Sequence, residues 1–279
     1  MQASIGRHAA YAAGWQDRGI PTRAIGYHLH RGQTQVPGML NPKLDVGHWA
    51  KNFALSRRVQ IHDVLLPEAA ERLYACLANE VPWGIAFTDG AQANFLSARE
   101  IAGFRQPDWL ALVNKAQAHA IGERQFRFIY NSYKMVEAYK EHRDPGLVLH
   151  HVLEFINSDA FLGLMRGVTG IADIHMAIAQ ATRYLPGHFL TAHNDIIGQE
   201  RRRVAYVLNL TKGWRADWGG LLQFTDGQEH VIDTFMPTFN SLTLFEVPMW
   251  HHVSYVSPFA AIGRYAITGW GMARVAGGV

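Results

Sequence analysis

The spacing of hydrophobic and polar residues changes twice along the chain. Residues 1–44 mix Gly, Pro, Arg and His without a period, which predicts an irregular N-terminal extension. Over residues 45–170 apolar side chains recur mainly at helical spacing, and over 171–279 they fall in short runs between Gly, Pro, Asn and Asp. We therefore expect a mainly helical supporting region and a β-rich core within one domain.

Three segments of the supporting region have the spacing of a helix. They cover residues 67–80, where Pro67 suits a first helical turn, 107–122 and 150–170. A short strand is expected just before Pro67. Residues 124–135 alternate aromatic and polar side chains, which is also typical of a strand.

The β-rich region contains eight short runs with strand composition. They cover residues 171–184, 189–193, 203–210, 220–225, 228–235, 240–246, 250–256 and 263–270. Short strands that follow helices predict an α+β fold, here a double-stranded β-helix (jelly-roll) barrel with supporting N-terminal helices. A small barrel of this kind can hold one ligand in its mouth.

Composition narrows the class of protein. The 279 residues are 48% hydrophobic and 18% charged, with a formal net charge of +3, which is typical of a globular protein with a sizeable core. Lys and Arg are scattered apart from the run 201–203, so we expect no nucleic-acid partner. The sequence carries no signal of an oligomeric state.

The single cysteine and the hydropathy pattern bear on location. Cys76 excludes an intrachain disulfide, and its place in a predicted helix suggests a buried thiol. No apolar run reaches the length of a signal peptide core or a membrane helix. We therefore expect a cytoplasmic protein without a membrane partner.

The strongest chemical signal is the pair His193-x-Asp195 followed by His251. Two histidines and one carboxylate hold Fe(II) in non-heme oxygenases and leave open metal positions. His193 and Asp195 point the same way if the segment is extended, and His251, 56 residues later, is expected from a distant strand across the mouth. His252 is the alternative ligand, although alternation with Val253 favours His251.

Chance matches to H-x-D are common in a chain with fifteen histidines, so the surrounding sequence matters. Three segments, "RYLPGHFLTAHND", "RRRVAYVLNLTKGWRADWGGLLQF" and "HHVSYVSPFAAIGRYAITGW", follow one another at residues 183–195, 201–224 and 251–270. Together they resemble the 2-oxoglutarate and Fe(II)-dependent dioxygenases, in the branch related to prolyl hydroxylases. Other histidines, His175, His188 and His230, are expected to make local hydrogen bonds or to face solvent.

The resemblance implies roles for further residues. Arg264 looks like the arginine that binds 2-oxoglutarate, and a guanidinium suits a terminal carboxylate. On a strand, Arg264, Ala266, Thr268 and Trp270 share one face, so Thr268 can line the same pocket. Tyr184 matches a tyrosine that lies near 2-oxoglutarate in related enzymes. The implied cofactors are Fe(II), 2-oxoglutarate as cosubstrate and O₂, with ascorbate as a candidate addition.

The activity implied by the resemblance is hydroxylation of an unactivated C–H bond with release of succinate and CO₂. A prolyl residue in a protein or peptide is the expected substrate, and a free amino acid or other small metabolite is the alternative. Two hypotheses from other functional classes remain open, namely a non-catalytic jelly-roll binding protein and a zinc-dependent lyase or isomerase.

Overall fold

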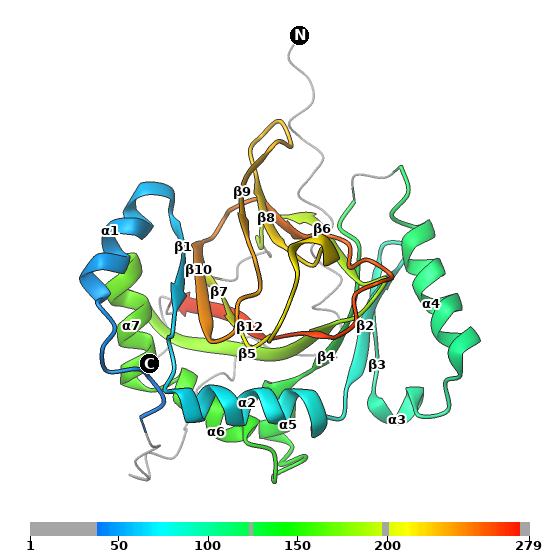
Figure 1. Ribbon diagram of the computed structural model, residues 1–279, viewed down its shortest axis with the longest axis horizontal. Coiled ribbons are helices and arrows are strands. Elements are labelled where there is room, and N and C mark those ends of the chain that lie inside the picture. Colours follow the sequence, from blue (N-terminus) through cyan, green and yellow to red (C-terminus); the bar gives the residue numbers. More distant parts are fainter. Residues whose placement is uncertain (1–37, 123–124, 197–200, 274–279) are drawn as a thin grey trace.

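One antiparallel sheet, wrapped into a nearly closed barrel, forms the centre of the protein (Figure 1). The computed structural model describes residues 38–122, 125–196 and 201–273. The strands are β1 (Arg58–His62), β2 (Gly84–Asp89), β3 (Gln92–Leu96), β4 (Phe128–Tyr133), β5 (Ile174–Tyr184), β6 (Phe189–His193), β7 (Arg202–Asn209), β8 (Leu222–Thr225), β9 (Val231–Phe235), β10 (Ser241–Glu246), β11 (His251–Val253) and β12 (Arg264–Ala273).

The order of the strands brings the two ends of the sheet together. The order is β1-β10-β7-β12-β5-β4-β6-β11-β8-β9, and β2 extends the sheet from β4 toward β3. Side chains join the two end strands: Arg58 Nε lies 2.7 Å from Asp233 Oδ2, and Gln60 Nε2 donates to the carbonyl of Met236 at 2.9 Å. The predicted α+β class and jelly-roll barrel are confirmed, and the eight predicted strands are β5 to β12.

The helices lie outside the barrel. They are α1 (Val46–Ser56), α2 (Pro67–Asn79), α3 (Ala98–Ile101), α4 (Gln106–Ala118), α5 (Met135–Lys140), α6 (Leu149–Ile156) and α7 (Asp159–Thr169). In Figure 1, α1 and α7 flank one side of the barrel, and α3 and α4 lie on the other. Pro67 begins α2, and Ala70, Leu73 and Cys76 of that helix are buried.

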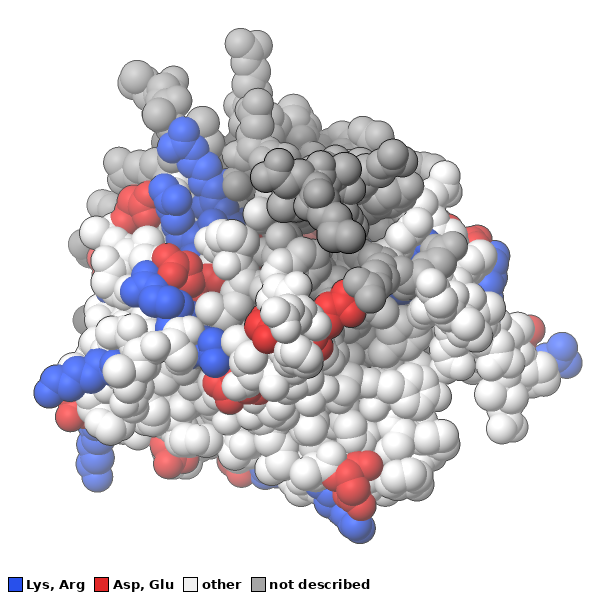
Figure 2. Space-filling model, turned by 90° about the horizontal axis from the view of Figure 1, so that it is seen from above, with Lys and Arg blue, Asp and Glu red and all other residues white. Residues whose placement is uncertain are grey.

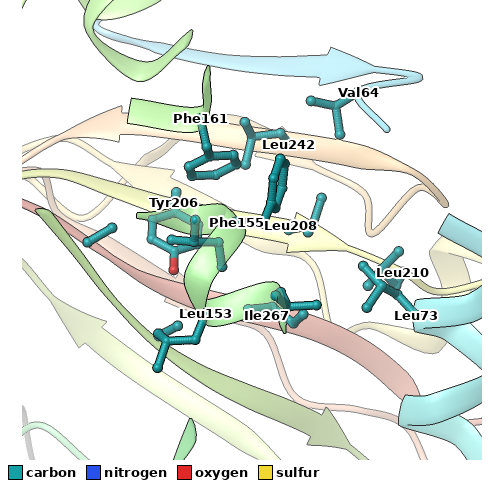
Figure 3. Packing of buried hydrophobic residues seen from close by; sticks show 14 of the residues in the cluster. Val64, Leu73, Leu153, Phe155, Phe161, Tyr206, Leu208, Leu210, Leu242 and Ile267 are labelled. Atoms are coloured by element: carbon teal, nitrogen blue, oxygen red, sulfur yellow. The ribbon is translucent and has the colours of Figure 1, made fainter. Parts of the chain in front are cut away.

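Side chains on the two faces of the sheet enter two different apolar clusters. On β12, Tyr265 and Ile267 pack in the outer cluster, together with residues of α2, α6 and α7. The alternate residues Ala266 and Trp270 belong to the cluster inside the barrel. Figure 3 shows the outer cluster, where Leu153, Phe155 and Phe161 of the helices meet Tyr206, Leu242 and Ile267 of the strands.

Some elements differ from the sequence prediction. Residues 150–170 form two helices, because the side chain of Ser158 accepts a hydrogen bond from the Phe161 amide and starts α7 as an N-cap. Helices α1, α3 and α5 and strands β2 and β3 were not predicted. Most of the expected extension 1–44 lies outside the described residues, whereas Leu40 forms a β-bridge with Leu65.

The described surface carries mixed charge. On the face seen in Figure 2, basic and acidic side chains of the described residues lie beside one another. Examples of such ion pairs are Arg57 with Glu246 and Arg203 with Asp173. Within the described part of the chain, no helix is both long enough and apolar enough to span a membrane.

Candidate metal and anion site

His193, Asp195 and His251 come together inside the barrel. His193 ends β6 and His251 begins β11, and the two are direct partners in the antiparallel β6–β11 pair. His193 Nε2 lies 3.4 Å from Asp195 Oδ1, and His251 Nε2 lies 3.6 Å from Asp195 Oδ2. One candidate ligand atom from each residue lies within 4.8 Å of the others. This arrangement can hold one metal ion.

Two details of the cluster differ from the expectation. Strand β11 is the neighbour of β6, so the expectation that His251 comes from across the mouth was wrong. Asp195 is not extended: its φ is +63°, and the side chain of Asn194 accepts a hydrogen bond from the Ile196 amide at 3.2 Å. A turn, and not strand alternation, therefore brings Asp195 beside His193.

Backbone carbonyls fix the tautomer of both histidines. Nδ1 of His193 lies 3.1 Å from the carbonyl of Thr191, and Nδ1 of His251 lies 2.8 Å from that of Met249. Because a carbonyl can only accept, Nδ1 is the donor in each contact, and in a neutral ring with this tautomer Nε2 keeps its lone pair. Both lone pairs are thus available to a metal, and the carbonyls hold the rings in place.

The electrostatics also suit a metal. Burial, together with His193, lowers the pKa of His251 to about 4, so its imidazole is neutral at neutral pH. Burial alone would raise the pKa of Asp195, but the neighbouring imidazoles and the guanidinium of Arg202 outweigh it and lower that pKa. A neutral imidazole and an ionised carboxylate are the forms in which these residues bind metals.

His252 points away from the cluster, because its Nε2 lies 3.0 Å from Gln223 Oε1. The structure thus brings His251, and not His252, to Asp195. The three other histidines singled out in the sequence make local hydrogen bonds: His175 with the carbonyl of Met272, His188 with the amide of Leu185, and His230 with Asp226.

A buried guanidinium occupies a second polar site inside the barrel. Arg264 begins β12, is 3% exposed, and pairs across the sheet with Tyr184, whose ring centroid lies 5.0 Å from its Cζ. Its Nε has no hydrogen-bond partner, and no carboxylate of a described residue forms an ion pair with it. Burial lowers the pKa of Arg264. A buried cation without a counter-ion is costly, so this site fits a ligand carboxylate.

Two tyrosines extend the anion site. Tyr184 stacks on Tyr130 of β4, with ring centroids 5.2 Å apart and an angle of 18°. Burial raises the pKa of Tyr184, and that of Tyr130 to about 12, so both hydroxyls keep their protons at neutral pH. No role was predicted for Tyr130 from the sequence. Its place in the aromatic segment that was predicted as a strand was the available signal of a role. Thr268 lies on the face of β12 that also carries Arg264.

Part of the chain matches a known protein family. Residues 179–272 match a model described as the 2OG-Fe(II) oxygenase superfamily. The matched segment runs from β5 to β12 and includes the three residues of the cluster and Arg264. Over this segment the chain is similar to 2OG-Fe(II) oxygenases.

One individual relative is similar to this chain in sequence. The chain is 30% identical over 138 residues to the mouse protein Prolyl 3-hydroxylase OGFOD1, a match that covers 47% of this chain and 24% of the relative. It therefore spans about a quarter of that protein's length. The family model and this relative confirm the predicted resemblance to prolyl hydroxylase-like oxygenases.

One solved structure shares the fold, and a second is also similar to this chain. An oxidoreductase of the 2OG-Fe(II) oxygenase family from Burkholderia pseudomallei is 11% identical, with a TM-score of 0.51 over 82% of this chain and 91% of that one. A prolyl-4-hydroxylase from Pseudomonas putida is 18% identical, with a TM-score of 0.48 over 82% of this chain and 99% of that one.

One residue beside His193, Asp195 and His251 was not predicted from the sequence. Arg202 Nη1 lies 3.7 Å from Asp195 Oδ1, and its Cζ lies 3.7 Å from the ring centroid of Trp270. Strand alternation would place Arg202 outside the barrel with Val204 and Tyr206. The register of β7 against β12 shifts at this point, however, and the sequence carries no signal of such a shift.

Proposed function

We propose that this domain is an Fe(II)- and 2-oxoglutarate-dependent dioxygenase that hydroxylates a prolyl residue in a protein or peptide. The observation that carries the proposal is the pairing of two sites inside one barrel. The cluster of His193, Asp195 and His251 suits Fe(II), and the unpaired guanidinium of Arg264 suits a carboxylate. A non-catalytic binding protein would need neither a complete ligand set nor an unpaired buried cation.

The residues fit both cofactors of the family. Nε2 of His193, the carboxylate of Asp195 and Nε2 of His251 would hold Fe(II), and Arg264 would hold the distal carboxylate of 2-oxoglutarate, with Tyr184 as a neighbouring donor. Bound there, Fe(II) and 2-oxoglutarate activate O₂, so that succinate and CO₂ form while one oxygen atom enters a C–H bond of the substrate. No protein acid or base is required for that chemistry.

Aromatic side chains keep this site in place and apolar. The Phe126 ring lies 4.5 Å from that of His193, and the Phe245 ring lies 4.6 Å from that of His251. Phe128 and Phe224 are buried in the same inner cluster. Such a wall restricts the imidazoles and excludes water, and a drier site strengthens the attraction between Arg264 and a carboxylate.

Exposed apolar residues next to the metal cluster favour a polypeptide substrate. Ile196 follows Asp195 and is 51% exposed, and Trp250 precedes His251 and is 40% exposed. Val231, 50% exposed, is the cross-strand partner of Thr225, whose amide donates to the Trp250 carbonyl. An exposed apolar surface of this kind suits contact with the residues that flank a target proline in a polypeptide. The name of the mouse relative points to the same substrate class.

The first experiment is anaerobic binding of Fe(II) and 2-oxoglutarate, followed by the visible charge-transfer absorption of the chelate. We expect the band in the wild type and its loss in His193→Ala and Asp195→Ala. The matched control His252→Ala should keep it, because His252 bonds Gln223 instead. Absence of the band in iron-loaded wild type, or its survival in both ligand variants, contradicts the proposal.

The substrate is tested separately with prolyl peptides and free proline, with and without ascorbate. Succinate release coupled to hydroxylation of a peptide is the expected result. Trp250→Ala should raise the KM for the peptide with little change in iron binding. Turnover of free proline alone would favour the alternative, a hydroxylase of an amino acid or other small metabolite. The cytoplasmic location stays a prediction.

A further inference from the structure

Arg202 and Arg203 are neighbours in sequence but face opposite sides of the barrel wall. Arg203 donates to Asp173 Oδ2 from Nη2 at 2.7 Å and from Nε at 3.0 Å, and its side chain is 44% exposed. The side chain of Arg202 is 9% exposed and lies beside Asp195. The arginine run at 201–203 therefore contains one residue directed at Asp195.

A local irregularity in the sheet turns Arg202 inward. Val204 pairs with Gly271 of β12, and the next pair is Arg202 with Met272, so β7 carries one extra residue at this point. An extra residue in one strand is a β-bulge, and bulges redirect side chains next to functional sites. Without it, Arg202 would share the outer face with Val204 and Tyr206, which belong to the outer cluster.

Stacking and charge hold the guanidinium at one place. Its Cζ lies 3.7 Å from the ring centroid of Trp270, which projects from β12 into the inner cluster. Its Nη1 lies 3.7 Å from Asp195 Oδ1, the oxygen that also lies 3.4 Å from His193 Nε2, whereas Oδ2 lies 3.6 Å from His251 Nε2. A planar guanidinium on an indole is a preferred arrangement that lysine cannot reproduce.

Asp195 needs such a partner because its backbone gives it little support. It lies beyond the end of β6, in a turn with φ +63°, so sheet hydrogen bonds do not fix its position as they fix those of His193 and His251. Its carboxylate is 5% exposed, so water cannot easily orient it. Neighbours that orient a metal-binding carboxylate commonly change metal affinity by about 10- to 100-fold.

We propose that Arg202 is a positioning residue for the metal centre: stacked on Trp270, it engages Asp195 Oδ1 and holds the carboxylate beside Nε2 of His193 and Nε2 of His251. This inference rests on the proposed function, since it assumes that the cluster binds a metal. It goes beyond that function in making the β-bulge and Trp270 parts of the metal site.

The test is the dissociation constant for Co(II), used as an air-stable probe, in the otherwise unliganded protein. The variants are Arg202→Gln, Arg202→Lys and the matched control Arg203→Gln, which removes the same charge from the outer face of the same strand. Melting temperature of the metal-free protein is measured for each. We expect Arg202→Gln to bind Co(II) about 10- to 100-fold more weakly, and Arg203→Gln to stay within about 2-fold of wild type.

The direction of the change in Co(II) affinity distinguishes a positioning role of Arg202 from a purely electrostatic one. A positive charge near a dication opposes its binding, so if Arg202 were only a nearby charge, Arg202→Gln would bind Co(II) more tightly and Arg202→Lys would bind as wild type does. Positioning instead predicts weaker binding in both, at a metal-free melting temperature close to that of wild type. If Arg202→Gln fails to fold, Arg202→Lys, which keeps the charge beside Asp195, decides the question.

Unchanged or tighter Co(II) binding in the folded Arg202 variants overturns this inference but leaves the proposed function standing. Failure of the wild type to bind Co(II) or Fe(II) would overturn both. An equal loss of affinity in Arg203→Gln would also overturn it, because the effect would then not depend on the contact with Asp195.

Discussion

Replacement of Arg264 by methionine should have different effects on folding and on ligand binding. Arg264 is 3% exposed, and no described carboxylate pairs with it. Replacing buried charges by apolar side chains of similar volume can stabilise a protein by about 1–4 kcal/mol. Loss of the contact with Tyr184 offsets about 1–2 kcal/mol of that gain. The free energy of unfolding of ligand-free Arg264→Met should therefore lie between about 1 kcal/mol below and about 3 kcal/mol above that of the wild type.

Binding of 2-oxoglutarate should fall sharply in the same variant. Truncating one partner of a buried, hydrogen-bonded charge pair costs about 2–5 kcal/mol, which corresponds to a loss of affinity of roughly 30- to 5,000-fold. At a ligand concentration of 100 times Kd, 2-oxoglutarate should stabilise the wild type by about 2.7 kcal/mol. That gain should disappear in Arg264→Met at the same concentration.

Urea unfolding followed by tryptophan fluorescence, with and without 2-oxoglutarate under anaerobic Fe(II), measures both effects. Arg183→Met is the control, because Arg183 Nε donates to Asn131 Oδ1 at 3.2 Å and its Cζ lies 5.2 Å from the centroid of Trp83. It should lose about 1–3 kcal/mol and keep its response to 2-oxoglutarate. The reasoning fails if ligand-free Arg264→Met loses more than about 2 kcal/mol and still gains stability from 2-oxoglutarate.

Three further predictions concern the framework around the site. Burial lowers the pKa of His188 to about 3, so between pH 6.5 and pH 3 the unfolded chain binds a proton at this residue that the folded chain does not bind. The free energy of unfolding should therefore fall by up to about 1.4 kcal/mol per pH unit as the pH drops from 6.5 toward 3. An unaltered pH slope in His188→Gln would contradict this prediction. Gly219→Ala would place a Cβ 2.0 Å from the Tyr255 carbonyl oxygen at φ +69°, and its free energy of unfolding in urea should fall by about 2–3 kcal/mol. Gly213→Ala is the control: φ is +67° but the space around the Cβ is open, so the loss should be about 1 kcal/mol. Cys76 is buried with its pKa raised to about 11 by burial, so it should react with a thiol reagent at pH 8 only after unfolding; prompt labelling of the native protein would refute this.

Strand composition between turn residues was sufficient to predict the strands β5 to β12, and in some of them alternation also predicted which side chains face inward. The alternation in β12 is one example: Arg264 and Ala266 lie inside, and Tyr265 and Ile267 lie outside, as their spacing predicts. The three candidate metal ligands could be predicted from the sequence for a different reason. They occur in short motifs, and the chemistry of two imidazoles and one carboxylate restricts what such motifs can do.

The features that could not be predicted are those where the backbone departs from a regular period. The left-handed conformation of Asp195 and the register shift at Arg202 each move a side chain to a position that strand alternation does not give. The adjacency of β6 and β11 depends on sheet order, which the number of intervening residues does not determine. The break at Ser158 depends on a cap within an otherwise continuous helical period.

The alternation along β12 has a consequence for insertions and deletions. Point substitutions on this strand can change the inner face without disturbing the outer one, because successive side chains enter different clusters. Deletion of a single residue between Tyr265 and Gly269 would exchange the two faces for every residue on one side of the gap. Chains that diverge in this segment should therefore differ by substitutions or by paired indels, and hardly ever by an odd change in length.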